Sequence, residues 1–254
     1  MALASGDQLP CSLMKIGTTS IAAPAIDWQG INRAFYAPMW QFARFVRTQC
    51  LQQVILHRDR AAISGGCVIA CTHVSHIEPM LLATIIDRPI FWMARQEFFR
   101  FRPLATMLRW AGAFSVNRSG VAVSSIRTAV RLARHGKIVG IFPEGGCVRG
   151  RELMFRGGSV KQGACAIAWR AQVPILPVVV LGTHELNTLD PWLPALQGRV
   201  WVVFGEPIPP PATPPQRACH RSTRRAMAEQ LQRSFIGTYH ELLDHAGLTD
   251  AFTP

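Results

Sequence analysis

The feature that most constrains the fold is an alternation of short apolar runs and helical segments, which starts at residue 67. The expected strands lie at 67–72, 90–95, 113–116, 137–142, 174–181 and 199–204, and the expected helices at 77–86, 96–111, 121–135 and 159–171. Strands that are apolar throughout are typical of a sheet that helices cover on both faces. The alternation therefore predicts an α/β fold with a mostly parallel sheet flanked by helices.

An amphipathic helix is expected before this core. Asp27 is the expected N-cap of a helix over about 28–56, in which apolar positions from Trp28 to Val46 keep spacings of three and four. Pro38 is expected to kink this helix. Because arginines and aromatic residues accompany the apolar stripe, the helix suits either the surface of the domain or a membrane boundary.

A stiff Pro-rich connector follows the core at 207–215. It leads into a basic amphipathic helix over about 216–245, which is expected to end near Gly247. The basic face of this helix suits solvent or anionic lipid. The predicted organisation is a loose tail (1–26), an amphipathic N-terminal helix (27–60), a central domain (61–206), and the connector with the C-terminal helix (207–254).

Composition restricts the class of partner. The chain has 27 Lys and Arg against 15 Asp and Glu, a net charge of +12, which indicates a polyanionic partner such as nucleic acid, an anionic membrane or a phosphorylated substrate. No apolar run approaches the roughly 18 residues of a spanning helix, and the start of the chain lacks the pattern of a secretory signal. Seven cysteines without C-x-x-C pairs favour reduced thiols. We expect a cytosolic protein that contacts a membrane without crossing it.

The stretch CTHVSHIEPM at 71–80 places polar side chains where the first core strand should end. In α/β folds active residues gather at such strand ends. His73 and Glu78 flank a strand-to-helix turn that can fold the carboxylate onto the imidazole, which fixes the tautomer and makes the other ring nitrogen a better base. No G-x-S-x-G nucleophile motif is present, so the nucleophile is expected to come from the substrate, for instance an alcohol.

Two other interpretations of this stretch stay open at this point. The first is a polar turn with a hydrogen-bonded imidazole and no chemistry. The second is a zinc site formed by Cys71, His73, His76 and Glu78, but the sequence has neither H-E-x-x-H nor paired cysteines, so no metal is expected. His76 is expected to be a supporting or surface group.

The stretch from His73 to Glu78 resembles the H-x-x-x-x-D motif of the glycerolipid acyltransferases, such as the 1-acylglycerol-3-phosphate acyltransferases. Four further blocks follow in the order of that family: 112–118 for G-x-F-x-x-x-R, 142–145 for F-P-E-G, 155–164 for F-K-x-G-A, and 173–178 for V-P-I-x-P-V. The resemblance covers about residues 65–205 and makes 61–206 the acyltransferase domain.

The resemblance implies direct transfer of a fatty acyl group from acyl-CoA or acyl-ACP to a hydroxyl of a lyso-lipid, with 1-acylglycerol 3-phosphate giving phosphatidate as the first choice. His73 and Glu78 would be the catalytic pair, and Arg118 and Lys161 would hold the acceptor phosphate. The full set of implied substrate-binding residues is Gly112, Phe114, Arg118, Glu144, Gly145, Gly146, Arg149 and Lys161. The resemblance implies no metal and no cofactor beyond the acyl thioester. It further implies phospholipid biosynthesis at the inner, cytoplasmic face of the cell membrane, on an anionic surface. Nucleic acid is not expected as a partner, because the sequence has no helix-turn-helix, zinc-finger or RNA-recognition signature and only the positive charge favours it.

The chain departs from the family pattern at three places. Glu78 stands where Asp is usual, Thr72 where Asn is usual, and Gly146-Cys147-Val148-Arg149 where Thr-Arg-Ser-Arg is usual. The missing basic residue at 147 leaves room for another acceptor, such as a lyso-aminolipid or a glycolipid, and Glu78 leaves room for a lipid-binding relative without catalysis. Cys147, a thiol with no predicted partner, is expected to be inert.

Overall fold

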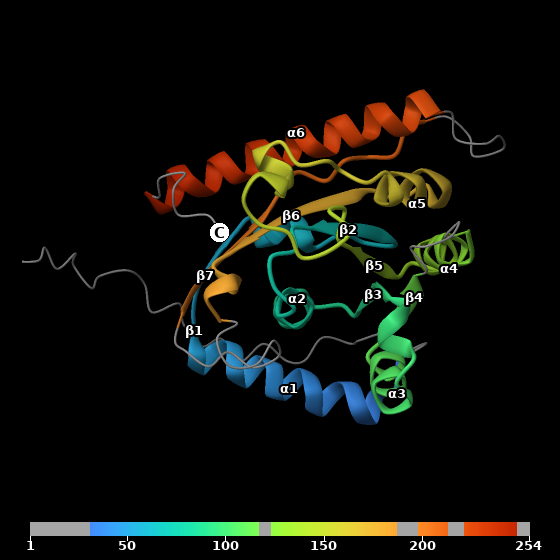
Figure 1. The fold of residues 1–254 in the computed structure, drawn as a ribbon, viewed down its shortest axis with the longest axis vertical. Helices are drawn as coiled ribbons and strands as arrows, with labels where there is room; N and C mark the ends of the chain where they lie inside the picture. Colours follow the sequence, from blue (N-terminus) through green and yellow to red (C-terminus); the bar gives the residue numbers. More distant parts are fainter. Residues whose placement is uncertain (1–30, 117–122, 187–197, 213–220, 248–254) are drawn as a thin grey trace, which may run out of the picture.

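The computed structural model describes residues 31–116, 123–186, 198–212 and 221–247. In this part of the chain a seven-stranded sheet has the order β1-β7-β6-β2-β5-β3-β4, with helices on both faces (Figure 1). The strands are β1 (Leu51–Leu56), β2 (Cys67–Cys71), β3 (Ile90–Arg95), β4 (Phe114–Val116), β5 (Ile138–Ile141), β6 (Ile175–Leu181) and β7 (Gly198–Phe204). Neighbouring strands are parallel except for β6 and β7, which confirms the predicted α/β class with a mostly parallel sheet.

Strand β2 lies between β6 and β5 and is buried along its whole length. Its side chains alternate between two cores: Val68 and Ala70 face one, while Cys67, Ile69 and Cys71 face the other. This period of two is what a strand covered on both faces requires, and it explains why the run reads as continuously apolar.

The helices form a layer on each face of the sheet. Their bounds are α1 (Arg33–Cys50), α2 (Glu78–Ile85), α3 (Arg102–Trp110), α4 (Val123–Arg134), α5 (Gly163–Ala171) and α6 (Arg221–Ala246). Figure 1 shows α2 on one side of the sheet with α1 and α3 beyond it, and α5 and α6 on the other side. None of the described helices combines the length and apolar character that crossing a membrane requires.

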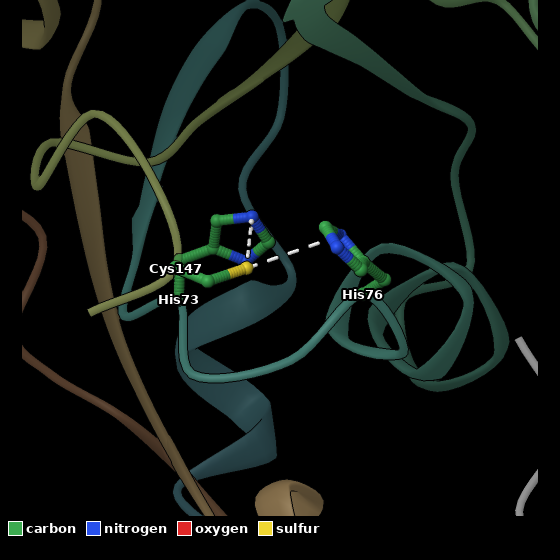
Figure 2. Close-up of side chains that lie close together, drawn as sticks. All are labelled: His73, His76 and Cys147. Carbon is green, nitrogen blue, oxygen red and sulfur yellow. Dashed lines mark hydrogen bonds between the residues drawn. The ribbon is translucent and has the colours of Figure 1, made fainter. Parts of the chain in front are cut away.

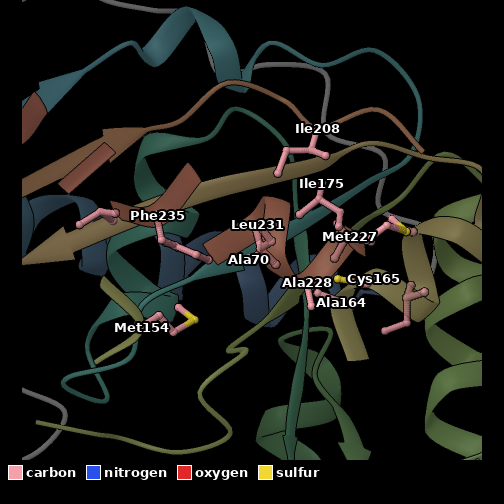
Figure 3. Packing of buried hydrophobic residues seen from close by; sticks show 14 of the residues in the cluster. Ala70, Met154, Ala164, Cys165, Ile175, Ile208, Met227, Ala228, Leu231 and Phe235 are labelled. Carbon is pink, nitrogen blue, oxygen red and sulfur yellow. The ribbon is translucent and has the colours of Figure 1, made fainter. Parts of the chain in front are cut away.

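Helix α6 confirms the predicted C-terminal helix and ends immediately before Gly247, whose φ of +60° is the left-handed geometry of a helix C-terminus. Met227, Leu231 and Phe235, spaced by four residues, point from α6 into the core (Figure 3). Residues 216–220, the predicted start of this helix, and the end of the Pro-rich connector lie outside the described residues.

The predicted N-terminal helix over 28–56 is wrong in extent. Helix α1 starts at Arg33, with the side chain of Asn32 accepting the Phe35 N–H, and it ends at Cys50. Residues Leu51–Leu56 form the edge strand β1, which pairs in parallel with β7. The apolar spacing alone could not reveal this change, because the pairing partner lies almost 150 residues further along the chain. The expected N-cap, Asp27, lies outside the described residues.

Two other predicted helices are shorter than expected. The segment 96–111 divides into a 3₁₀ turn, Gln96–Phe99, and α3, where Pro103 lies in the first turn that tolerates proline. The helix expected from residue 159 starts at Gly163, so Lys161 lies in the preceding loop. This correction matters because Lys161 is a candidate phosphate ligand.

Candidate active site

The candidate site lies where three neighbouring parallel strands end. His73 follows β2, Phe142 and Glu144 follow β5, and Thr183 follows β6. Because the carboxyl ends of parallel strands meet at one edge of a sheet, residues more than 100 positions apart come together there.

The pair predicted from the sequence is present as a hydrogen-bonded unit. Nδ1 of His73 lies 3.1 Å from Oε2 of Glu78, so the imidazole donates its Nδ1 proton to the carboxylate. That contact leaves Nε2 of His73 as the ring nitrogen with a lone pair. Glu78 is fully buried and His73 is 9 % exposed, which keeps the pair largely out of water while the ring reaches the surface.

Glu78 is held from a second side. Thr183 donates its hydroxyl proton to Oε1 of Glu78 at 2.6 Å, and Glu78 is the first residue of α2, where a carboxylate is favoured by the helix dipole. The hydroxyl therefore fixes the carboxylate that orients His73. Sequence reasoning missed Thr183; the available signal was a polar residue two positions after the apolar run 175–181.

The face of the His73 ring is fixed by stacking. Phe142 lies parallel to it with ring centroids 3.8 Å apart, and Trp92 stacks on the far side of Phe142 at 4.8 Å. Trp92 can lie there because Gly140 has no side chain; a Cβ at that position would fall 2.4 Å from the indole ring. One strand residue without a side chain thus supports the column that positions the imidazole.

Glu144 of the F-P-E-G block has a positioning contact. Its Oε2 accepts the backbone N–H of His73 at 2.7 Å, and its Oε1 accepts that of Met154 at 3.4 Å. Burial raises the pKa of Glu144 to about 7, although both hydrogen bonds act in the opposite direction. The carboxyl group therefore connects the F-P-E-G block with the backbone at His73 and at Met154. A direct contact with an acceptor stays a prediction.

Gly145 and Lys161 lie against each other. Gly145 has a φ of +84°, and a Cβ on it would fall 2.1 Å from Nζ of Lys161. The backbone N–H of Lys161 also donates to the carbonyl of Pro143 at 2.9 Å. The structure thus brings the exposed Lys161 amine to the F-P-E-G loop. This loop and His73 both lie at the edge of the sheet where the parallel strands end.

The remaining candidates are distributed differently. Gly112, with a φ of +84°, packs against Ile31 and Phe91, and the half-buried Phe114 begins β4, so packing accounts for both. Gly146 and the exposed Arg149 flank Cys147 in the loop after β5. Arg118 lies outside the described residues.

The expectation that the Cys147 thiol has no partner is wrong. Its Sγ lies 3.2 Å from Nε2 of His73 and 3.9 Å from Nδ1 of His76 (Figure 2). A hydrogen bond from the Val148 N–H to the His73 carbonyl, 3.0 Å long, holds the two loops together. Burial, followed by the charge of Glu78, raises the pKa of Cys147 to about 11, so the thiol is protonated near neutral pH. No local pattern in the sequence indicates this contact between residues 74 positions apart.

This arrangement has a definite chemical capacity. An imidazole whose Nδ1–H is held by a buried carboxylate can accept a proton at Nε2, and the carboxylate stabilises the imidazolium that results. The thiol that lies against Nε2 of His73 is protonated near neutral pH. The site therefore suits general-base activation of a hydroxyl group brought by a substrate.

Comparison with known proteins identifies the family. A family model described as Acyltransferase matches residues 46–181, more than half of the chain. The chain is 30 % identical over 155 residues to the 1-acyl-sn-glycerol-3-phosphate acyltransferase of Bacillus subtilis, covering 61 % of this chain and 72 % of that protein. It is also 30 % identical over 116 residues to 1-acyl-sn-glycerol-3-phosphate acyltransferase beta of Homo sapiens, covering 44 % of this chain and 40 % of the human protein.

A solved structure is similar in fold. The crystal structure of the 1-acyl-sn-glycerophosphate acyltransferase PlsC from Thermotoga maritima matches with a TM-score of 0.56 and 18 % identity. The match covers 81 % of this chain and 79 % of that one. At this identity the likeness concerns the architecture, namely the sheet with its flanking helices.

Proposed function

Since the chain belongs to the acyltransferase family, we propose that it moves a fatty acyl group from an acyl thioester to a hydroxyl group of a lyso-lipid. The donor is acyl-CoA or acyl-ACP. The acceptor is 1-acylglycerol 3-phosphate, and the product is phosphatidate. The resemblance of the sequence blocks and the names of the relatives support this choice of acceptor.

One observation carries the proposal: Nδ1 of His73 donates to the buried Glu78 carboxylate across 3.1 Å. Nε2 then removes the proton of the acceptor hydroxyl as its oxygen attacks the thioester carbonyl. The C–S bond breaks, the thiolate leaves, and the imidazolium returns the proton to it. The acceptor hydroxyl takes the place of the Cys147 thiol beside Nε2. The Cys147 side chain is exposed, so it can rotate away from this position.

The acceptor phosphate is assigned to the loop before α5. Lys161 presents an exposed ammonium group over Gly145, close to the loops that hold His73. A lysine is a point charge suited to a phosphate monoester. Lys161→Gln should therefore raise KM for 1-acylglycerol 3-phosphate by about 10-fold, the effect of losing roughly 1.4 kcal/mol of binding, and leave KM for the acyl thioester unchanged.

We further propose that the enzyme binds the inner, cytoplasmic face of the cell membrane peripherally, through α1 and α3. The large exposed hydrophobic residues of the described chain lie on these helices or directly before α3: Phe42, Phe45, Phe101, Met107 and Trp110. Arg44 and Arg47 on α1 line a pocket together with Arg58. Burial, followed by the charges of Arg44 and Arg58, lowers the pKa of Arg47. Asp87 pairs with Arg58 there, and the three arginines leave the pocket with a net positive charge. Apolar rings beside net positive charge suit an anionic lipid surface.

The test is a transfer assay with purified protein, long-chain acyl-CoA or acyl-ACP, and a panel of lyso-acceptors, with products identified by mass. We expect phosphatidate from 1-acylglycerol 3-phosphate and its loss in His73→Ala. His245→Ala, which removes an exposed imidazole at the end of α6, is the matched control. Equal and negligible turnover in the wild type and His73→Ala would instead identify a lipid-binding relative. Preferred turnover of a lyso-aminolipid or glycolipid would reassign the acceptor.

A further inference from the structure

We propose that His73, His76 and Cys147 form a binding site for a thiophilic divalent cation, with Zn²⁺ as the expected ion. Occupation of this site would switch off the proposed base. The donor atoms are Nε2 of His73, Nδ1 of His76 and Sγ of Cys147, and all lie within 4.8 Å of one another (Figure 2). This set differs from the Cys71-containing set considered from the sequence, because the sulfur comes from the loop after β5.

The separations suit a tetrahedral ion. Zinc bonds of about 2.3 Å to sulfur and about 2.0–2.1 Å to nitrogen place S and N about 3.6 Å apart and two nitrogens about 3.4 Å apart at a tetrahedral angle. The observed sulfur–nitrogen distances are 3.2 and 3.9 Å, on either side of that value. The two nitrogens must approach by at most about 1.4 Å, given the 4.8 Å limit on all separations.

The first ligand is already oriented. Nδ1 of His73 donates to the Glu78 carboxylate, and Phe142 stacks on the ring, so Nε2 is held toward Cys147. A histidine whose second nitrogen donates to a carboxylate is the usual arrangement around protein-bound zinc. The buried Glu78 carboxylate and the Cys147 thiolate, which forms when the bound thiol releases its proton to solvent, together balance the two charges of the ion.

The two sides of the site are held together by the fold. The Val148 N–H donates to the His73 carbonyl at 3.0 Å, which fixes the loop of Cys147 beside that of His73. His76 lies three residues after His73, and the two rings meet edge to face with centroids 5.8 Å apart. The exposed Cys147 gives an ion access from solvent. Imidazole and thiolate select Zn²⁺ over Mg²⁺, which prefers oxygen ligands.

The consequence for activity rests on the proposed function. A metal on Nε2 of His73 occupies the lone pair that must take the proton from the acceptor hydroxyl, so the bound ion inhibits. Removal of the ion by a chelator restores the base. The binding itself does not depend on any activity, so the two can be tested separately.

Binding is tested with Co²⁺ as a spectroscopic substitute and Zn²⁺ as competitor, on the full chain. We expect one equivalent of Co²⁺ with tetrahedral absorption and a thiolate-to-cobalt charge-transfer band, both displaced by Zn²⁺ and unaffected by Mg²⁺. Loss of an outer hydrogen-bond partner alone weakens metal sites about 10–100-fold, so Cys147→Ser and His76→Ala should each raise Kd at least about 100-fold. His245→Ala is the control for binding by a surface imidazole. A charge-transfer band that survives in Cys147→Ser would overturn the proposal.

A second measurement needs no variant. Zn²⁺ should protect Cys147 from alkylation by iodoacetamide at least 10-fold in rate, read by mass spectrometry at that residue. Unchanged alkylation would count against the site even if the variants fail to fold.

In the transfer assay, each protein is compared with its own rate in chelator: Zn²⁺ should inhibit the wild type and His245→Ala, but not Cys147→Ser. An enzyme that is active and insensitive to bound Zn²⁺ would refute the switch. Absence of transfer in chelator would instead refute the proposed function, and the cobalt spectrum would still decide the metal site.

Discussion

At the scale of single residues, the length of Glu78 decides how well His73 is positioned. Its carboxylate bridges Nδ1 of His73 and the hydroxyl of Thr183, at 3.1 and 2.6 Å. Glu78→Asp keeps the charge but withdraws the carboxylate by roughly 1 Å, so we expect kcat to fall about 100-fold with little change in KM. Steady-state kinetics measure this effect. Glu229→Asp makes the same change on an exposed face of α6 and should leave the rate unaltered. Wild-type kcat in Glu78→Asp would show that the length of this side chain does not decide how His73 is positioned.

Glu144 should make stability depend on pH. Burial raises its pKa from an ordinary value of 4.5 to about 7 in the folded protein, so the folded state binds the proton more tightly than the unfolded state. The contribution is therefore fully present below pH 4.5 and is lost as the pH rises to about 7. It amounts to about 3 kcal/mol in the free energy of unfolding. Urea titrations of the wild type and Glu144→Gln at pH 5 and pH 8 should show this fall only in the wild type. Parallel pH dependence in both proteins would contradict it.

The residues of the site differ in how far the sequence could reveal them. His73 and Glu78 share one turn, so local spacing was enough to predict their contact. Thr183 and Cys147 reach the same pair from 105 and 74 positions away, and only the arrangement of the strands brings them there. Local spacing carries no information on such contacts. The contact of Cys147 with His73 is the one that most changes the chemistry of the site.

At the scale of elements, β5 supports the site through a residue that has no side chain. A Cβ on Gly140 would fall 2.4 Å from the ring of Trp92, which stacks on Phe142 and through it on His73. We expect Gly140→Ala to lower the free energy of unfolding by about 1–3 kcal/mol, the usual cost of overpacking. It should also lower kcat, because the column of rings shifts. Urea unfolding and steady-state kinetics report the two effects.

The matched control lies in α6. Gly237 has no atom within 4 Å of where its Cβ would be, so Gly237→Ala should stabilise the protein by up to about 1 kcal/mol. Equal effects of the two substitutions would mean that the contact with Trp92 carries no strain. The comparison separates steric conflict from the general effect of replacing glycine.

The elements themselves were predictable where the pattern is local. The six strands from residue 67 onward were placed within one residue or so of their observed bounds, because buried strands are apolar on both faces. The edge strand Leu51–Leu56 was missed because its LQQVIL sequence continues the spacing of α1. Its conformation is set by pairing with β7, a tertiary interaction that overrides local preference.

At the scale of the whole molecule, positive charge and exposed aromatic rings give the protein two different sides. The net charge is +12, and basic residues occur on α1 and also on α6. Figure 1 shows α1 and α3 on the side of the sheet opposite α6. The exposed aromatic side chains of the described chain lie on the α1 and α3 side. Because both sides carry basic residues, charge alone does not decide which side contacts the membrane. The same ambiguity was present when the sequence alone was considered. The aromatic residues favour α1 and α3.

Vesicle binding should therefore depend on α1 rather than on α6. Phe42 and Phe45 are 53 % and 62 % exposed, and burying a phenylalanine side chain is worth about 1.5–3 kcal/mol. We expect the double variant Phe42→Ser/Phe45→Ser to bind phosphatidylglycerol vesicles at least 10-fold more weakly in co-sedimentation. Arg221→Gln/Arg225→Gln, two exposed arginines on α6, should bind almost as the wild type does. Binding of every variant should weaken at 1 M salt, where the screening length falls to about 3 Å. If the α6 variant loses binding and the α1 variant keeps it, the membrane meets the opposite side of the sheet and the aromatic residues of α1 serve another contact.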